Sequence, residues 1–104
     1  MKIVRDYREV AVRITDERLA HILEHPEMVG LEQEMEATLV RPERVVQSLA
    51  DPEARLYYRL LRETPVGDKY LCVVVKDRVA DTFLLTAYLT DKVKRGDTIW
   101  PQSA

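Results

Sequence analysis

The chain has 104 residues, of which 46% are hydrophobic and 33% charged, a composition typical of one globular domain. Its formal net charge of −2 excludes a strongly basic nucleic-acid-binding protein, and a single cysteine excludes an internal disulfide and a cysteine-rich zinc site. We expect one domain over residues 1–104, with its core in residues 10–100. No apolar run approaches the ~20 residues of a membrane span and no signal-peptide core follows Met1, so the sequence predicts a cytoplasmic protein without a membrane partner.

The charges are distributed unevenly along the chain. Residues 15–40 carry seven carboxylates and one arginine, whereas residues 41–79 carry eight basic and six acidic side chains. An acidic helical side and a mildly basic sheet side could focus an anion onto the sheet, or they could be solvated faces that differ in sign.

Two helices are predicted in the first half of the chain, after a short strand at residues 10–14 that is rich in β-branched side chains. Thr15 is a favourable N-cap for the first helix, which must end near His25 because the following proline disfavours helical geometry. Apolar residues at helical spacing predict a second helix from Pro26 to the Arg41-Pro42 pair. The buried stripe of this helix should comprise Met28, Leu31, Met35 and Leu39.

Three long strands are predicted in the second half, over residues 54–60, 69–76 and 82–89, with a brief strand at residues 45–46. Residues 66–68 and 77–81 supply the hairpin turns. Residues 91–96 are compatible with a last helical turn, and we expect Trp100 to lie against the core. Helices followed by an antiparallel meander predict an α+β fold, with two N-terminal helices packed on a four-stranded antiparallel sheet.

Side chains alternate along a strand, so the predicted strands can be sorted into two faces. The face with Leu56, Tyr58, Leu71 and Val73 should be the core. The other face would carry cations, tyrosines and a threonine, which include Arg55, Tyr57, Arg59, Lys76, Thr86 and Tyr88. Arginine forks match phosphate oxygens, and tyrosine can stack on a base. This face could therefore hold a polyanion, or it could be the solvated outer face of an antiparallel sheet.

His21 and His25 lie four residues apart and share one face of the predicted helix. No carboxylate stands at a matching spacing and no HExxH pattern exists, so we expect neither a metal site nor a cofactor. His25 lies at a helix end beside a proline, where an imidazole suits general acid or base chemistry or simply interacts with the helix C-terminus.

Four segments together resemble a known family. They are His21–Met28, which contains the His-Pro-Glu sequence, Asp51–Arg59, Gly67–Lys76 and Thr86–Asp91. In this order they are similar to the phage-associated branch of the barnase–EndoU–colicin–RelE-like nuclease superfamily, and the similarity extends over most of the chain, from about residue 14 to residue 100.

The resemblance implies a small metal-independent ribonuclease associated with phage-borne or toxin systems. It implies His25 as general acid or base, Arg55 as the phosphate-binding cation, and Thr86 or Tyr88 as the polar contribution of the last strand. On the same predicted face, we expect the substrate to contact Tyr57, Arg59 and Lys76.

Two classes of function follow from these observations. The first is an endoribonuclease that acts on RNA and is neutralised by an immunity or antitoxin protein. The alternative is a non-catalytic module that binds a nucleic acid or a protein through the polar sheet face. A homodimer formed through an edge strand is compatible with both.

Overall fold

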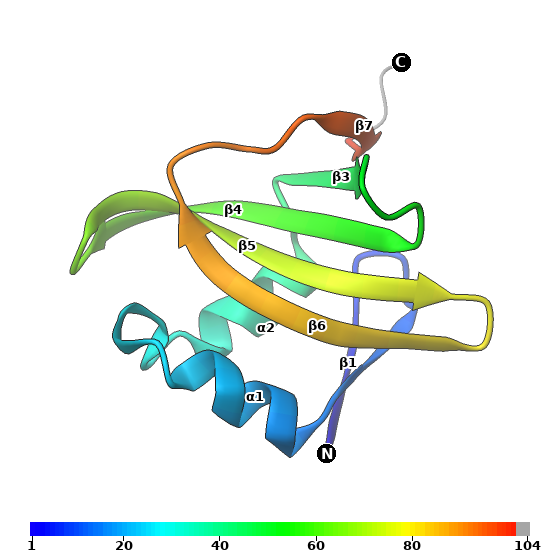
Figure 1. The fold of residues 1–104 in the computed structure, drawn as a ribbon, viewed down its shortest axis with the longest axis horizontal. Coiled ribbons are helices and arrows are strands. Elements are labelled where there is room, and N and C mark those ends of the chain that lie inside the picture. Colours follow the sequence, from blue (N-terminus) through cyan, green and yellow to red (C-terminus); the bar gives the residue numbers. More distant parts are fainter. Residues whose placement is uncertain (102–104) are drawn as a thin grey trace.

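The computed structural model describes residues 1–101. The elements follow in the order β1 (Lys2–Arg5), β2 (Ala11–Ile14), α1 (Asp16–Leu23), η1 (Pro26–Met28, a 3₁₀ helix), α2 (Glu32–Val40), β3 (Arg44–Ser48), β4 (Ala54–Thr64), β5 (Gly67–Arg78), β6 (Asp81–Thr90) and β7 (Gly96–Trp100). Figure 1 shows α1 and α2 together on one side of the long strands β4, β5 and β6. No helix in these residues is long and apolar enough to cross a membrane.

The α+β class fits the structure, but the prediction of a four-stranded antiparallel sheet is wrong. Within the described residues, seven strands form one mixed sheet in the order β1-β2-β6-β5-β4-β3-β7, with β2 parallel to β6. The prediction missed both edge strands, β1 and β7, and residues 91–96 contain no helical turn. These edge strands have only four and five residues, too few for a clear alternating pattern. β1 pairs with the adjacent β2, whereas β7 pairs with β3, which is distant in sequence, and local periodicity does not reveal such a contact.

The predicted start of the first helix is confirmed, and the predicted start of the second helix is wrong. Thr15 is the N-cap of α1, and its hydroxyl accepts a hydrogen bond from the backbone N–H of Arg18 at 3.2 Å. Pro26, however, begins only the short η1, and α2 starts at Glu32. The interruption falls at Gly30, whose φ of 84° lies in the left-handed region that helices cannot continue through.

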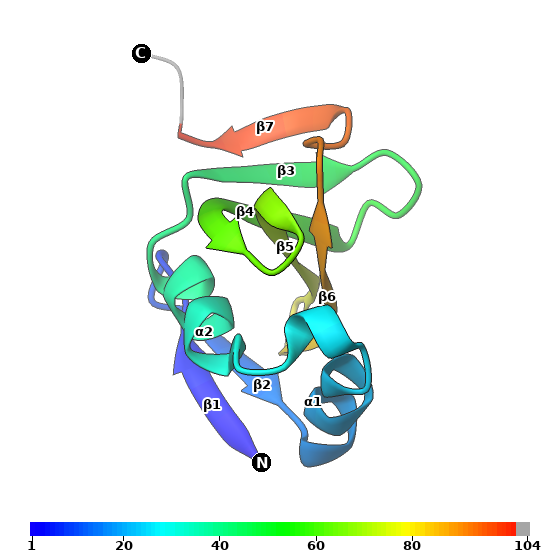
Figure 2. The same cartoon turned by 90° about the vertical axis from the view of Figure 1, so that its left-hand side faces the viewer.

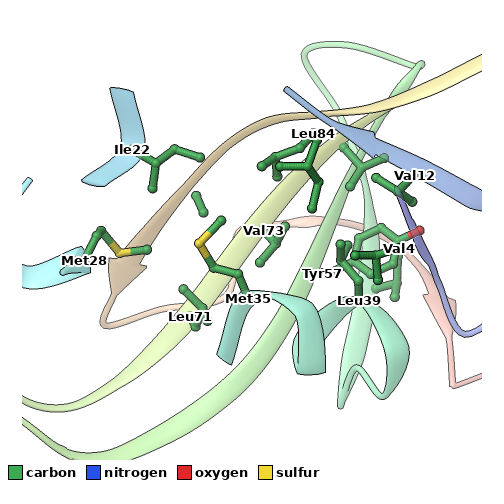
Figure 3. Close-up of a cluster of buried hydrophobic side chains, with 14 residues drawn as sticks. Val4, Val12, Ile22, Met28, Met35, Leu39, Tyr57, Leu71, Val73 and Leu84 are labelled. Atoms are coloured by element: carbon green, nitrogen blue, oxygen red, sulfur yellow. The ribbon is translucent and has the colours of Figure 1, made fainter. Parts of the chain in front are cut away.

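The main core lies between the helices and one face of the sheet. Figure 3 shows Met28 and Met35 from the helical segments directed toward the side chains of β5 and β6, and Leu39 directed toward β4. The opposing side chains include Leu71, Val73 and Leu84, and all six are at most 2% exposed. Burial of each such side chain stabilises the fold by roughly 1.5–3 kcal/mol.

The opposite face of the sheet is also buried in part. Tyr58 and Cys72 are fully buried there, in a second apolar cluster that Val93 covers. The segment from β6 to β7 crosses this face, and the backbone N–H of Lys94 donates to the Tyr58 hydroxyl at 3.1 Å. Figure 2 shows this connection rising from β6 to β7 beside β3. The sheet therefore has no fully solvated face.

A buried carboxylate attaches the β1–β2 turn to the sheet. The Asp6 side chain is fully buried, and its Oδ1 accepts from the backbone N–H groups of Arg8 and Val10 at 2.8 and 3.1 Å. Its Oδ2 accepts from the Arg8 guanidinium at 2.9 Å and from the Tyr57 hydroxyl at 2.6 Å. A buried carboxylate is stable only when it is paired and hydrogen-bonded in this way.

We expect Tyr57→Phe to lower the free energy of unfolding by about 1–3 kcal/mol, because the buried Asp6 carboxylate would lose one donor. The measurement is urea-induced unfolding. Tyr70→Phe is the matched control, since Tyr70 is half-buried and makes no side-chain hydrogen bond within residues 1–101, and its cost should stay within about 0.5 kcal/mol. Equal costs for the two variants would contradict the role given to Asp6.

Candidate functional site

The structure separates the predicted site residues onto the two faces of the sheet. Strand register places Tyr57 beside Val73 and Ala87 on the helix-covered face, whereas Tyr58 lies beside Cys72 and Tyr88 on the opposite face. The helix-covered face therefore carries Arg55, Tyr57 and Arg59. The opposite face carries Lys76, Thr86 and Tyr88. The predicted grouping of Tyr57 with Tyr88 on one surface is wrong, and so is the predicted placement of Tyr58 in the helix-covered core.

Arg55 and Tyr57 belong to one polar cluster at the β1–β2 turn. Burial, together with the hydrogen bond to Asp6, raises the pKa of Tyr57 above its ordinary value, so this phenol stays protonated. The Arg55 Nε lies 3.5 Å from the Asp77 carboxylate, which also accepts from Arg8 at 3.0 Å. Two guanidiniums thus balance two carboxylates, and this cluster carries no free charge for a substrate.

The two remaining cations of the predicted binding set differ, because Lys76 is paired with carboxylates, whereas Arg59 contacts a backbone carbonyl and its Nε has no hydrogen-bond partner among the described residues. Arg59 donates through Nη1 to the backbone carbonyl of Arg41 at 2.7 Å. The Lys76 ammonium contacts the carboxylates of Asp51 at 2.5 Å and Glu53 at 3.6 Å. The Lys76 contacts attach the β3–β4 connection to the sheet, and the Arg59 contact attaches the segment between α2 and β3.

Tyr88 and Thr86 lie together on β6 but away from the cations of the helix-covered face. Tyr88 is beside Cys72 and Tyr58, where burial raises the pKa of Tyr58 to about 12 and also raises the pKa of the Cys72 thiol. Burial likewise raises the pKa of Tyr88. These groups stay neutral near neutral pH, so none of them is a ready general base.

His25 is exposed at the N-cap of η1 and lies far along the sheet from Arg55. Leu31, shortly after η1, lines a groove with residues 60–65 at the β4–β5 hairpin, whereas Arg55 lies at the other end of β4. Figure 1 shows the segment between α1 and α2 and the start of β4 at opposite ends of the molecule. The structure does not bring His25 and Arg55 into one site.

A cleft of about 670 Å³ lies between α1 and the edge of β6. Its lining comes from β2, α1 and β6, and comprises Arg13, Thr15, Glu17, Arg18, Ala20, His21, Glu24, Phe83 and Leu84. It holds one imidazole, two carboxylates and two guanidiniums. A concave site with convergent polar groups of this kind is the default candidate for ligand binding.

The cleft exists because β2 leaves the edge of β6 almost at once. In the described residues the two strands pair only at Arg13 and Phe83, and the chain then turns at Thr15 into α1. A β-bulge follows at Leu85, where β6 has one residue more than β5. The Leu85 carbonyl accepts from the Arg18 guanidinium at 3.4 Å, so the bulge and the helix hold the two walls together. Bulges are common next to functional sites, where they redirect side chains.

His21 lies on the cleft side of α1, between two carboxylates. Glu17, His21 and Glu24 follow at spacings of four and three residues and share one helical face. The His21 Nδ1 lies 3.4 Å from the Glu24 carboxylate, and both side chains are well exposed to solvent. From the sequence, His21 is a candidate metal ligand and His25 is the expected acid–base group. The i, i+4 spacing of Glu17 and His21 is the signal in the sequence, so the prediction that no carboxylate stands at a matching spacing is wrong for His21.

The described residues hold no group of three or more His, Cys, Asp or Glu side chains arranged to bind a metal ion. His21 and Glu24 form only a pair.

No protein-family model, no curated protein and no solved structure matches this chain. The resemblance to the barnase–EndoU–colicin–RelE-like nucleases therefore stays a prediction.

The Asp77 carboxylate gives a test of the polar cluster at the β1–β2 turn. Burial alone would raise the pKa of Asp77, but hydrogen bonds from Arg8 and Thr82 outweigh it and the pKa is lowered. A pKa lowered by folding stabilises the native state above the ordinary Asp value of about 4, and this stability is lost as the pH falls through the folded value.

Wild-type protein should therefore lose more unfolding free energy between about pH 6 and pH 2 than Asp77→Asn, when both are measured by urea titration. Asp97→Asn is the control, since Asp97 is exposed on β7, and it should keep the wild-type pH dependence. Identical pH profiles for Asp77→Asn and wild type would show that the Asp77 contacts do not stabilise the fold.

Proposed function

We propose that the protein is a metal-independent endoribonuclease whose active site is the cleft between α1 and β6. The observation that carries this proposal is the convergence of His21, Glu17, Arg13 and Arg18 on one cleft. Cleavage of RNA by its own 2′-hydroxyl requires a base, an acid and cations, and these residue types supply all three.

The reaction balances without an external reactant. The 2′-oxygen attacks the neighbouring phosphorus, and the Glu17 carboxylate accepts the proton of the 2′-hydroxyl. The bond between phosphorus and the 5′-oxygen then breaks, and protonated His21 donates a proton to that leaving oxygen. The products are a 2′,3′-cyclic phosphate and a free 5′-hydroxyl.

The remaining cleft residues stabilise and orient these groups. Arg18 would neutralise the negative charge that develops on the phosphorane oxygens, and Arg13, which is paired with Asp81, would add hydrogen-bond donors. Glu24 lies close enough to His21 Nδ1 to hold the imidazole with its other nitrogen toward the substrate. This arrangement differs from the one that the family resemblance implies, in which His25 and Arg55 carry the chemistry.

The chain's two histidines give a matched test of the site. With total RNA and EDTA, His21→Ala should reduce the cleavage rate by about 10²–10⁴-fold, the usual effect of losing a general acid. His25→Ala should cleave at the wild-type rate, because its exposed side chain lies outside the cleft lining.

Each alternative predicts a different pattern in this assay. Loss of cleavage in His25→Ala together with full activity in His21→Ala would move the active site to the residues that the resemblance implies. Intact RNA with wild-type protein across a broad pH range would exclude the nuclease and favour a non-catalytic binding module.

A further inference from the structure

We propose that this cleft accepts one unpaired nucleotide of a single-stranded RNA and discriminates against base-paired duplex, an inference that rests on the ribonuclease function proposed above. Three features of the cleft lead to it: the number of its cations, the acidic residues beside it, and the flat side chains in its wall.

The cleft has one guanidinium that is not already paired with a carboxylate, which suffices for about one phosphate. Arg18 forms no ion pair with any side chain of residues 1–101, and its guanidinium reaches only the Leu85 carbonyl. Arg13 is paired with Asp81 at 2.9 Å but remains partly exposed. A protein that grips a long duplex neutralises many more phosphates, since duplex nucleic acid carries about one charge per 1.7 Å.

The carboxylates of the helix beside the cleft would repel the phosphates of a second nucleic-acid strand. α1 and the residues just after it carry Asp16, Glu17, Glu24 and Glu27, against the single Arg18. One strand can place its phosphate at Arg18, but the second strand of a duplex would bring further phosphates against these carboxylates. Like charges at short range cost binding energy and select against that partner.

The wall formed by β6 offers a surface for a base. Phe83 lines the cleft and is half-buried, and the Arg13 guanidinium lies 5.3 Å from the centroid of its ring. Aromatic rings and guanidinium planes are the surfaces on which unpaired bases stack. A base in a duplex is already stacked on its neighbours and cannot enter such a cleft without leaving them.

Binding can be measured apart from cleavage with a fluorescent 2′-O-methyl RNA hexamer, which lacks the attacking hydroxyl. Fluorescence anisotropy would compare the free strand with the same strand annealed to its complement, at several salt concentrations. We expect the single strand to bind at least about tenfold more tightly, with a log–log salt slope of about −0.7, because one phosphate of a single strand contributes about that amount.

Arg18→Ala should bring this slope close to zero, because it removes the one cleft guanidinium that has no carboxylate partner. Arg62→Ala is the matched control, since Arg62 is exposed on the β4–β5 hairpin and lies outside the α1–β6 cleft, and its slope should equal that of wild type.

Phe83→Leu keeps an apolar side chain in the wall and should weaken single-strand binding about tenfold by removing the stacking surface. Circular dichroism would verify that each variant is folded.

Equal affinity for the duplex, or an unchanged slope in Arg18→Ala, would overturn this inference. The cleavage assay judges the proposed function separately. Cleavage of duplex and single strand alike would retain the nuclease and reject the single-strand preference, whereas selective single-strand binding without cleavage of unmodified RNA would support the preference and reject the nuclease.

Discussion

The fold depends on the buried carboxylate of Asp6. Its hydrogen bonds to the backbone of the β1–β2 turn and to the Tyr57 hydroxyl attach the first hairpin to the middle of the sheet. That attachment places β2 beside β6, which sets the position of Arg13 and of Thr15, the N-cap of α1. The location of the cleft, between α1 and β6, thus follows from one charged group that cannot be left unpaired in the interior.

The chemistry of the cleft is a consequence of incomplete strand pairing. β2 pairs with β6 at one position only, and the chain then turns into α1. The helix therefore lies beside the rest of β6, where β2 would lie if the two strands stayed paired. Helical spacing gathers Glu17 and His21 on the side of that gap, and the bulge at Leu85 gives Arg18 a carbonyl to contact. The site therefore belongs to the boundary between helix and sheet and not to a sheet face.

Local signals in the sequence predicted the helices, the long strands and the N-cap at Thr15, because capping and periodicity act over a few residues. Local signals could not predict which side chains of β4 point toward the helices. Tyr57 and Tyr58 are both fully buried, so the alternation of side chains along β4 does not favour one face over the other. Arg55 looked like an outward-facing cation, yet it points to the helix-covered side because Asp77, distant in sequence, neutralises it there. Such compensation is visible only once tertiary contacts are known.

The central claim is that the cleft between α1 and β6 is where the substrate binds. The most direct measurement is a two-dimensional ¹H–¹⁵N NMR titration of the protein with a short 2′-O-methyl oligonucleotide. The account predicts that the perturbed backbone amides cluster in α1 and around Phe83 and Leu85, with little change at Cys72 or Tyr88. Perturbations centred on Cys72 and Tyr88, with α1 unaffected, would contradict it and place the binding surface on the opposite face of the sheet.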